Sequence, residues 1–453
     1  MSHTHTHTHA ETTPEAEAHQ RRAFKTMILI VIPIAVWTVV AMIVMWPHDV
    51  ADHIRSDTSS YSVEGLTIPT GRVVSVTEHS CDGEVGSVPG VESTCASGEV
   101  QVTEGPEKDS IVQVEFTAAH YASGVKEGTK VKLFRIPLPD GGAAYQFADF
   151  ERSTPLIVFI LGFCVAVVVV ARFRGFMGLV GLGFAAVVIT QFMFPALVSG
   201  DDPVLVGLVG SSAIMFVVLY TAHGFSARTT TALLGTLFGL AVAAGLGVVA
   251  TRWAHLTGVA SEEDYLLAAS APDMQLTSVV ICGIIVAGLG VMNDVTITQA
   301  SAVWELSNSG QRSAAQLFTS AMRIGRDHIA STVYTIAFAT AGASLSTLLL
   351  ISVYQRGMWE VIQTEVFSAE ILRTVVGSIG LVLAMPLTTA IGVAAVRLGS
   401  RPPAEVDDED LDDEDLDDEL DEDRDGDLDE VEVVEDENFG EDPDAPYRPT
   451  SRR

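Results

Sequence analysis

Eight stretches of this sequence are each long and apolar enough to cross the hydrocarbon core of a membrane as a helix. One helical crossing needs about 20 mostly apolar residues. The stretches are residues 27–46, 155–171, 176–198, 204–222, 229–250, 276–292, 331–353 and 373–396. Hydrocarbon offers no partner for free backbone groups, so each stretch is predicted to be helical. The sequence therefore predicts a mainly α protein, an eight-span bundle of transmembrane helices.

Charge is distributed unevenly along the chain. Residues 404–453 hold 26 acidic and 4 basic side chains, which account for most of the net charge of −32. The other 403 residues carry charge at about 13% of their positions, whereas soluble domains carry it at roughly a quarter. The body is therefore expected to have the lipid bilayer as its partner. It lacks the basic surface of a nucleic-acid-binding protein, so no nucleic acid is expected.

Basic residues beside the spans predict their orientation. If the N-terminus is cytoplasmic, most basic residues that flank spans fall on the inner side: Arg21, Arg22, Lys25, Arg172, Arg174, Arg228, Arg312, Arg323, Arg326, Arg397 and Arg401. The short outer loops then hold only Arg252 and Arg356, with Arg373 at a span end. Because Lys and Arg stay on the cytoplasmic side, we predict a multi-pass plasma-membrane protein with both termini in the cytoplasm.

This orientation divides the chain into five parts. We predict a disordered His-rich cytoplasmic tail (1–26), a transmembrane anchor (27–46), an extracytoplasmic β-rich domain (47–154), a seven-helix membrane bundle (155–397) and a disordered acidic cytoplasmic tail (398–453). The apolar run of the anchor is longer than that of a signal peptide, and no small-residue cleavage site follows it. We therefore expect it to remain uncleaved.

The segment between spans 1 and 2 carries the signals of a small β domain. Apolar and polar residues alternate in 72–77, 99–103, 111–117 and 130–133, which predicts at least four antiparallel strands in a barrel-like domain. Cys81 and Cys95 are expected to form a disulfide in this oxidising compartment, the alternative being two free thiols. The domain could capture a ligand, dock a protein partner or cap the bundle.

The two tails offer weaker functional signals. His3, His5, His7 and His9 stand at alternate positions, and several imidazoles can bind a transition metal, although a solvated tail is the simpler interpretation. The acidic tail has too few apolar residues to fold. It is expected to be a solvating segment or a docking segment for a protein partner. No cofactor is predicted.

The clearest candidate site begins in the sixth span. An ionisable residue inside a span is costly and indicates function. Asp294, Thr298, Ser301 and Glu305 follow one another at steps of 4, 3 and 4, so they share one face if the sixth helix continues beyond residue 292. Alternatively, the span ends there and Asp294 caps the next helix.

A second group of charged residues precedes the seventh span. Arg323 and Asp327 are four residues apart and are expected to pair on one helical face. Arg326 is then expected to reach the headgroups. The alternative is a gate in which Arg323 or Arg326 pairs with Asp294.

Several strings in the chain resemble the YibE/F family of bacterial integral membrane proteins. They are RTTTALLGTL at 228–237, VMNDVTITQASAVWEL at 291–306, IGRDHI at 324–329 with GASL at 342–345, and VGSIGL at 376–381 followed by MPLT at 385–388. The matching order covers residues 155–397. The resemblance implies a polytopic plasma-membrane protein with transport as the presumed role. It supplies no catalytic or ligand residues.

These observations favour a permease or secondary transporter of a small solute or ion. The alternative is a non-transporting membrane scaffold or accessory factor that docks partners through its outer domain and acidic tail. We predict no enzyme and no catalytic residue. An intramembrane aspartyl protease built on Asp294 and Asp327 would need an Asp directly after Gly288-Leu-Gly290, where this chain has Val291.

Overall fold

A computed structural model describes residues 14–55, 65–81, 94–138, 141–309, 313–354 and 357–400 of the chain. The four histidines His3, His5, His7 and His9 and the acidic segment lie outside the described residues. Their metal-binding and docking roles therefore stay predictions.

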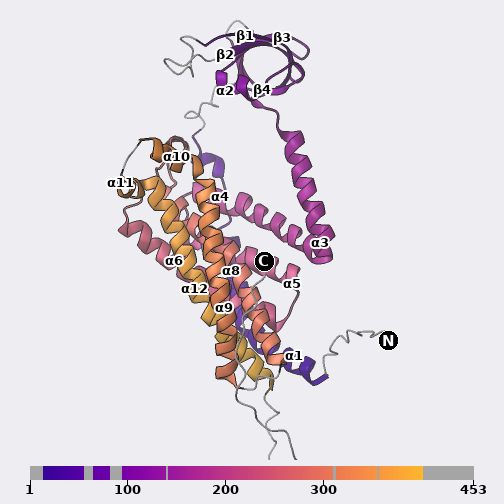
Figure 1. The fold of residues 1–453 in the computed structure, drawn as a ribbon, viewed down its shortest axis with the longest axis vertical. Coiled ribbons are helices and arrows are strands. Elements are labelled where there is room, and N and C mark those ends of the chain that lie inside the picture. The colour runs from indigo at the N-terminus through magenta and orange to yellow at the C-terminus, as the bar shows by residue number, and fades with distance from the viewer. Residues whose placement is uncertain are drawn as a thin grey trace, which may run out of the picture. The chain divides into compact units, whose positions relative to one another are not determined.

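Most of the described residues are helical (Figure 1). Among the described helices, six are long and apolar enough to span a membrane. They are α1 (Pro14–Val44), α3 (Ser153–Val188) with its continuation through η2 (Ile189–Met193) and α4 (Phe194–Val198), α5 (Pro203–His223), α6 (Ala227–Trp253), α8 (Leu276–Asn308) and α12 (Glu365–Ser400). The other helical elements are η1 (Val50–His53), α2 (Ala118–Ala122), α7 (Glu262–Ser270), α9 (Ala314–Ala343), α10 (Leu345–Tyr354) and α11 (Met358–Ile362). The number and apolar character of the long helices define a multi-pass membrane protein.

Two of the eight predicted spans follow each other across a sharp kink, and a third is divided. The predicted spans 155–171 and 176–198 correspond to the two helical arms from α3 to α4, which meet at a kink at Arg172, where φ is 52° and ψ is −134°. Figure 1 shows the change of direction in α3. The predicted span 331–353 is divided between α9 and α10. The polar first half of α9, which carries Arg323, Arg326 and Asp327, makes α9 less apolar than the six long helices.

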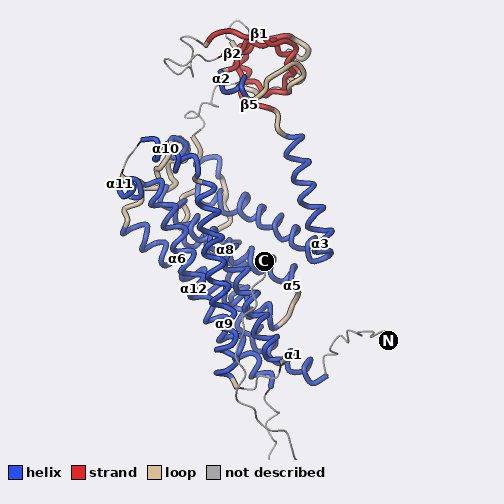
Figure 2. Tube along the Cα trace, in the orientation of Figure 1, coloured by secondary structure: helices blue, strands red, loops and turns tan. Residues whose placement is uncertain are grey.

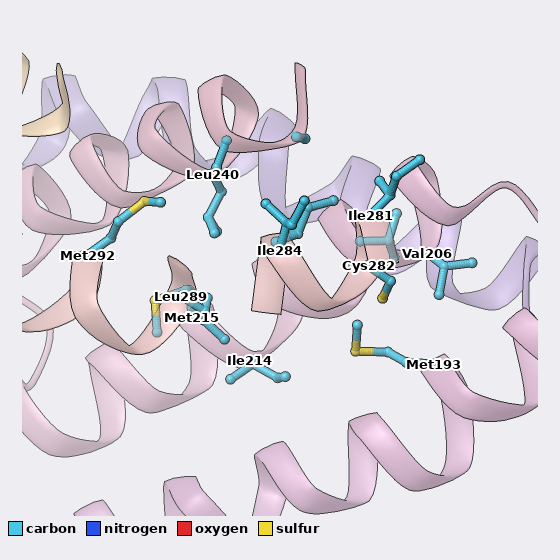
Figure 3. Packing of buried hydrophobic residues seen from close by; sticks show 14 of the residues in the cluster. Met193, Val206, Ile214, Met215, Leu240, Ile281, Cys282, Ile284, Leu289 and Met292 are labelled. Carbon is cyan, nitrogen blue, oxygen red and sulfur yellow. The ribbon is translucent and has the colours of Figure 1, made fainter. Parts of the chain in front are cut away.

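The centre of the helical body is formed by α6, α8 and α12, which contact one another most extensively. Glycines permit this contact, since a Cβ atom on Gly380 of α12 would lie 3.0 Å from the carbonyl oxygen of Gly239 on α6. Small residues at helix interfaces allow such close packing in lipid. Figure 3 shows the neighbouring apolar core, to which Met215, Leu240 and Ile284 contribute from α5, α6 and α8.

A second apolar cluster identifies one end of the helical body. It joins the beginnings of α1, α6 and α9 to the ends of α8 and α12 through Ala23, Met27, Ala227, Val303, Trp304, Leu317, Ala321, Val393 and Ala395. The opposite helix ends are joined by different contacts. His53 Nδ1 lies 2.8 Å from Asp273 Oδ2, and Glu365 Oε1 accepts a hydrogen bond from the backbone N–H of Gly258 at 2.6 Å.

The segment between α1 and α3 forms an antiparallel sheet of five strands (Figure 2). The strands are β1 (Thr70–Ser80), β2 (Thr94–Val102), β3 (Ile111–Phe116), β4 (Lys130–Pro137) and β5 (Ala143–Phe150), in the order β3-β2-β1-β4-β5. Because β3 also contacts β5, the sheet closes around a core that includes Val100, Phe116 and Leu133. This is the architecture of small five-stranded barrels of the OB type.

The predictions for this β domain are largely confirmed. All four predicted strands are present, and the Cys81–Cys95 disulfide joins the end of β1 to the beginning of β2. The fifth strand, β5, was not predicted from the alternation pattern.

Candidate functional site

A polar cavity of about 500 Å³ lies among α3, α5, α6 and α8. It is lined by Arg174, His223, Ser226, Ala227, Arg228, Thr229, Asp294, Ile297, Thr298, Ser301 and Trp304. Ala227 and Trp304 also belong to the apolar cluster at the helix ends, so the cavity adjoins that end of the helical body. Three of the four residues predicted to form a polar stripe on the sixth span therefore face one cavity.

The stripe exists because α8 does not break at Asn293. The helix runs without interruption from Leu276 to Asn308, so Asp294 lies inside it rather than at an N-terminal cap. Asn308 follows 14 residues later, a distance of about 21 Å along a helix that rises 1.5 Å per residue. Asp294 is thus placed near the middle of a helix of membrane-spanning length.

The hydroxyl groups on this stripe present acceptors to the cavity. Thr298 Oγ1 donates to the carbonyl oxygen of Asp294 at 2.7 Å, and Ser301 Oγ donates to that of Ile297 at 2.8 Å. These bonds use the single hydroxyl proton of each residue, so the free lone pairs can accept a hydrogen bond from a solute. With the carboxylate of Asp294, they form an acceptor wall along α8.

The other walls supply hydrogen-bond donors. Arg174 follows the kink in α3, and Arg228 lies in the first turn of α6. Ser226 caps α6 by accepting the backbone N–H of Thr229 at 3.1 Å, which turns the positive end of this helix toward the same cavity. The site can therefore bind a small polar solute that both donates and accepts hydrogen bonds.

The nearest basic partner of Asp294 is His328 of α9, which sequence reasoning did not select. Its Nε2 atom lies 3.8 Å from Asp294 Oδ2. That nitrogen is buried and, among the described residues, has no hydrogen-bond partner. The side chain of Asp294 is 71% exposed in the isolated chain and that of His328 is 33% exposed. The only signal in the sequence was the position of His328 directly after Asp327.

The fourth stripe residue, Glu305, pairs with a residue of the cavity wall. Its Oε1 atom lies 4.0 Å from Arg228 Nη2, and both side chains are exposed. An exposed pair of this kind contributes little to stability. It nevertheless places a carboxylate and a guanidinium together beside the cavity.

The second charged group lies on one helix, α9, as predicted, but among the described side chains it does not form the predicted ion pairs. Arg323, Arg326 and Asp327 are exposed on α9 and do not line the cavity. Within the described part of the chain, neither arginine forms an ion pair with Asp294, and Arg323 does not pair with Asp327. The place expected for a gating arginine is held by His328.

A buried polar layer lies on the opposite face of α8. Gln299 donates through Nε2 to Thr389 Oγ1 at 2.7 Å and to the carbonyl oxygen of Ala321 at 3.1 Å. Thr236 and Thr296 share a hydrogen bond of 2.7 Å between their hydroxyl groups. These bonds link α6, α8, α9 and α12 beside the cavity. No group of three or more His, Cys, Asp and Glu side chains in the described ranges is placed to hold a metal ion.

The long apolar helices define a polytopic membrane protein, and the cavity gives it a polar site that is open to the surface. The family model of YibE/F-like proteins matches residues 159–398, which is more than half of the chain. The chain therefore belongs to the YibE/F-like protein family, as the sequence strings predicted. The matched range contains Arg174, Asp294 and His328, whereas the β domain precedes it. No curated protein and no solved structure matches the chain.

Proposed function

We propose that this YibE/F-like protein is a permease or secondary transporter of a small polar solute or ion, and that it has no enzymatic activity. The observation that carries the proposal is the carboxylate of Asp294, which lies near the middle of a membrane-length helix and faces a cavity of about 500 Å³. A charged side chain at that position is costly in lipid and is retained where it serves a pathway.

The chemistry of the cavity walls supports a polar solute. Carboxylate and hydroxyl acceptors on α8 oppose the guanidinium groups of Arg174 and Arg228. A zwitterion or a hydrated ion can satisfy both walls at once, whereas an apolar molecule would leave the charged groups without partners.

The distance between Asp294 and His328 supports proton coupling. A carboxylate and an imidazole 3.8 Å apart can hold one proton between them through small movements or one bridging water. Binding a cationic group at Asp294 would release His328 from this pair. Solute binding and proton release would then be linked at one position.

The proposed orientation has both termini in the cytoplasm and eight crossings of the plasma membrane. It is supported by the helix ends that share one apolar cluster, because the same ends carry Arg21, Arg22, Lys25, Arg228 and Arg397. The kink at Arg172 divides the helix from α3 to α4 into two arms long enough for two crossings. The backbone hydrogen bond from Leu348 to Ser344, at 3.0 Å, supports a crossing shared by α9 and α10.

The test is flux in liposomes that contain the full chain and an internal pH-sensitive dye. Potassium, sodium, ammonium, phosphate and a mixture of amino acids are added outside as separate probes. The wild type is expected to change the internal pH with at least one probe. Asp294→Asn is expected to abolish that change, and His328→Gln is expected to uncouple solute uptake from proton movement.

Asp327→Asn is the matched control, because it removes a neighbouring carboxylate that does not line the cavity. It is expected to keep wild-type flux. If the folded wild type moves none of the probes, or if Asp294→Asn transports normally, the transport proposal fails.

In that case the second candidate function is a membrane scaffold or accessory factor. It is supported by the β domain, which has its own apolar core and disulfide and so offers a rigid surface to a protein partner outside the bilayer. Capture of a partner by the full chain, lost when residues 65–150 are removed, would support this function.

A further inference from the structure

A second polar cavity, of about 460 Å³, lies in the β domain where the chain enters α3. Its walls come from the beginnings of β1 and β4, the end of β2 and the first residues of α3. They are formed by Thr70, Gly71, Arg72, Thr103, Glu104, Lys130, Lys132, Glu151, Ser153 and Thr154. Three of these side chains are cationic and two are anionic.

The strand register forces two of the cations together. Arg72 of β1 stands directly opposite Lys130 of β4, and Thr70 stands opposite Lys132. Like charges directly opposite each other on an antiparallel pair destabilise the sheet. An anion bound between the two side chains would relieve this repulsion.

The two carboxylates of the cavity are joined to Lys132, the third cation, rather than to Arg72 or Lys130. Lys132 Nζ lies 3.1 Å from Glu151 Oε2 and donates to Thr70 Oγ1 at 3.0 Å. Thr70 in turn donates to Glu104 Oε2 at 3.1 Å. Glu151 also accepts the backbone N–H of Ser153 at 3.0 Å. Both carboxylates are thus joined to Lys132, one directly and the other through a hydroxyl.

The positive charges of Arg72 and Lys130 have no counter-charge among the described residues. Within the described residues, neither side chain forms a hydrogen bond or an ion pair, and both are exposed. They offer a planar guanidinium and an ammonium to the cavity, and Ser153 and Thr154 add hydroxyl donors from the first turn of α3. Guanidinium and ammonium groups that converge in this way match the oxygens of a phosphate group.

The position of the cavity points to the same ligand. Ser153 and Thr154 line it, and the apolar run of α3 begins at the next residues, with Leu156, Ile157 and Val158 exposed. A helix of this kind enters the hydrocarbon there. The cavity therefore lies at the depth of lipid headgroups, whose phosphate oxygens can accept hydrogen bonds from guanidinium and ammonium groups.

We propose that this cavity binds a phosphate group through Arg72 and Lys130. The phosphate is supplied by a phospholipid headgroup or by a soluble phosphate ester at the same surface. The site is distinct from the cavity that contains Asp294 and does not depend on a transport function.

The test compares the full-length wild type with Arg72→Gln/Lys130→Gln. The matched control is Lys108→Gln/Lys126→Gln, which removes the same charge from exposed positions of the β domain that do not line the cavity. Proteins purified in maltoside detergent with phosphatidylglycerol present are examined by native mass spectrometry for retained lipid. Binding of glycerol 3-phosphate is measured separately by calorimetry in the absence of lipid.

The expected result is that the cavity variant loses one retained phospholipid, or binds glycerol 3-phosphate about tenfold more weakly or worse, which corresponds to about 1.4 kcal/mol or more. The control should behave like the wild type. Loss of lipid alone identifies a headgroup as the source, and loss of glycerol phosphate alone identifies a soluble ester. The melting temperature of the variant without ligand should not fall, because the like-charge pair has been removed.

The proposal is overturned if wild type and cavity variant retain the same lipid and bind glycerol 3-phosphate equally. It is also overturned if the wild type binds neither, or if the control loses binding to the same extent as the cavity variant.

Discussion

Replacing Gly235 by alanine tests whether α6 and α12 are packed as closely as the structure indicates. A Cβ atom at Gly235 would lie 1.9 Å from Thr388 Oγ1 and 3.0 Å from Thr388 Cβ. Thr388 is fully buried, and its hydroxyl donates to the carbonyl oxygen of Ala384 at 2.8 Å. Rotating the Thr388 side chain removes the first clash but not the second, so the two helices must also move apart.

The expected cost follows from these contacts. Overpacking a closely packed core costs about 1–3 kcal/mol. Replacing a helical glycine by alanine also stabilises the folded state by up to about 1 kcal/mol, because alanine has the higher helix propensity. Relative to a glycine-to-alanine control on the same helix, which has the same gain in propensity, Gly235→Ala is therefore expected to lose about 1–3 kcal/mol, or about 2–12 °C in melting temperature.

Thermal unfolding can be followed with a thiol-reactive dye in detergent. Cys282 is buried in the core and reacts only on unfolding, and a Cys164→Ser background removes the more accessible thiol. Gly245→Ala is the matched control on the same helix, because a Cβ atom there meets nothing within 4 Å. An unchanged or raised melting temperature in Gly235→Ala, relative to Gly245→Ala, would refute the packing of α6 against α12.

Three further outcomes are expected. Gln299→Leu removes both hydrogen bonds of the buried amide and should cost about 1 kcal/mol in the same thermal assay; an equal melting temperature would contradict a stabilising role for the amide. Cys81→Ser/Cys95→Ser should lower the stability of the β domain by about 3 kcal/mol and raise hydrogen exchange in β1 and β2, whereas unchanged exchange would mean that the disulfide is not needed there. Arg135 Nε donates to Glu107 Oε2 at 2.6 Å, and this hydrogen bond holds the pKa of Glu107 at about 2, below its usual 4.5. The resulting stabilisation is present above pH 4.5 and is lost as the pH falls toward 2, so the protection factors of β4 amides, corrected for the intrinsic exchange rate at each pH, should fall over that interval in the wild type and fall less in Glu107→Gln.

The parts of the fold that were predicted correctly depend on local patterns. Apolar runs located the long helices because hydrocarbon imposes the same requirement on every crossing. Strict alternation located four strands because each has one buried face, as in the Val112 and Val114 positions of β3. The pairing of Cys81 with Cys95 followed from their position in one short segment.

The parts that were missed depend on contacts between distant residues. The residues of β5 are mostly half-buried on both faces, so its sequence lacks alternation and the strand is specified by pairing with β4. Residues 172–175 form a kink because Arg172 alone leaves helical backbone angles within α3, and the sequence holds no signal for this. Likewise, Asp294 and His328 are 34 positions apart, and only the approach of α9 to α8 selects His328 over Arg323 or Arg326 as the neighbour of that carboxylate.

The unbroken course of α8 links the cavity to the helix ends mechanically. A continuous hydrogen-bonded helix is stiff along its axis, so Asp294 cannot shift in depth unless Trp304 and Glu305 shift with it. Trp304 is buried between the beginnings of α6 and α9, and Glu305 faces Arg228. If a bound solute shifts Asp294 along the axis of α8, Trp304 therefore moves by the same distance, and the contacts of Trp304 with the beginnings of α6 and α9 must rearrange.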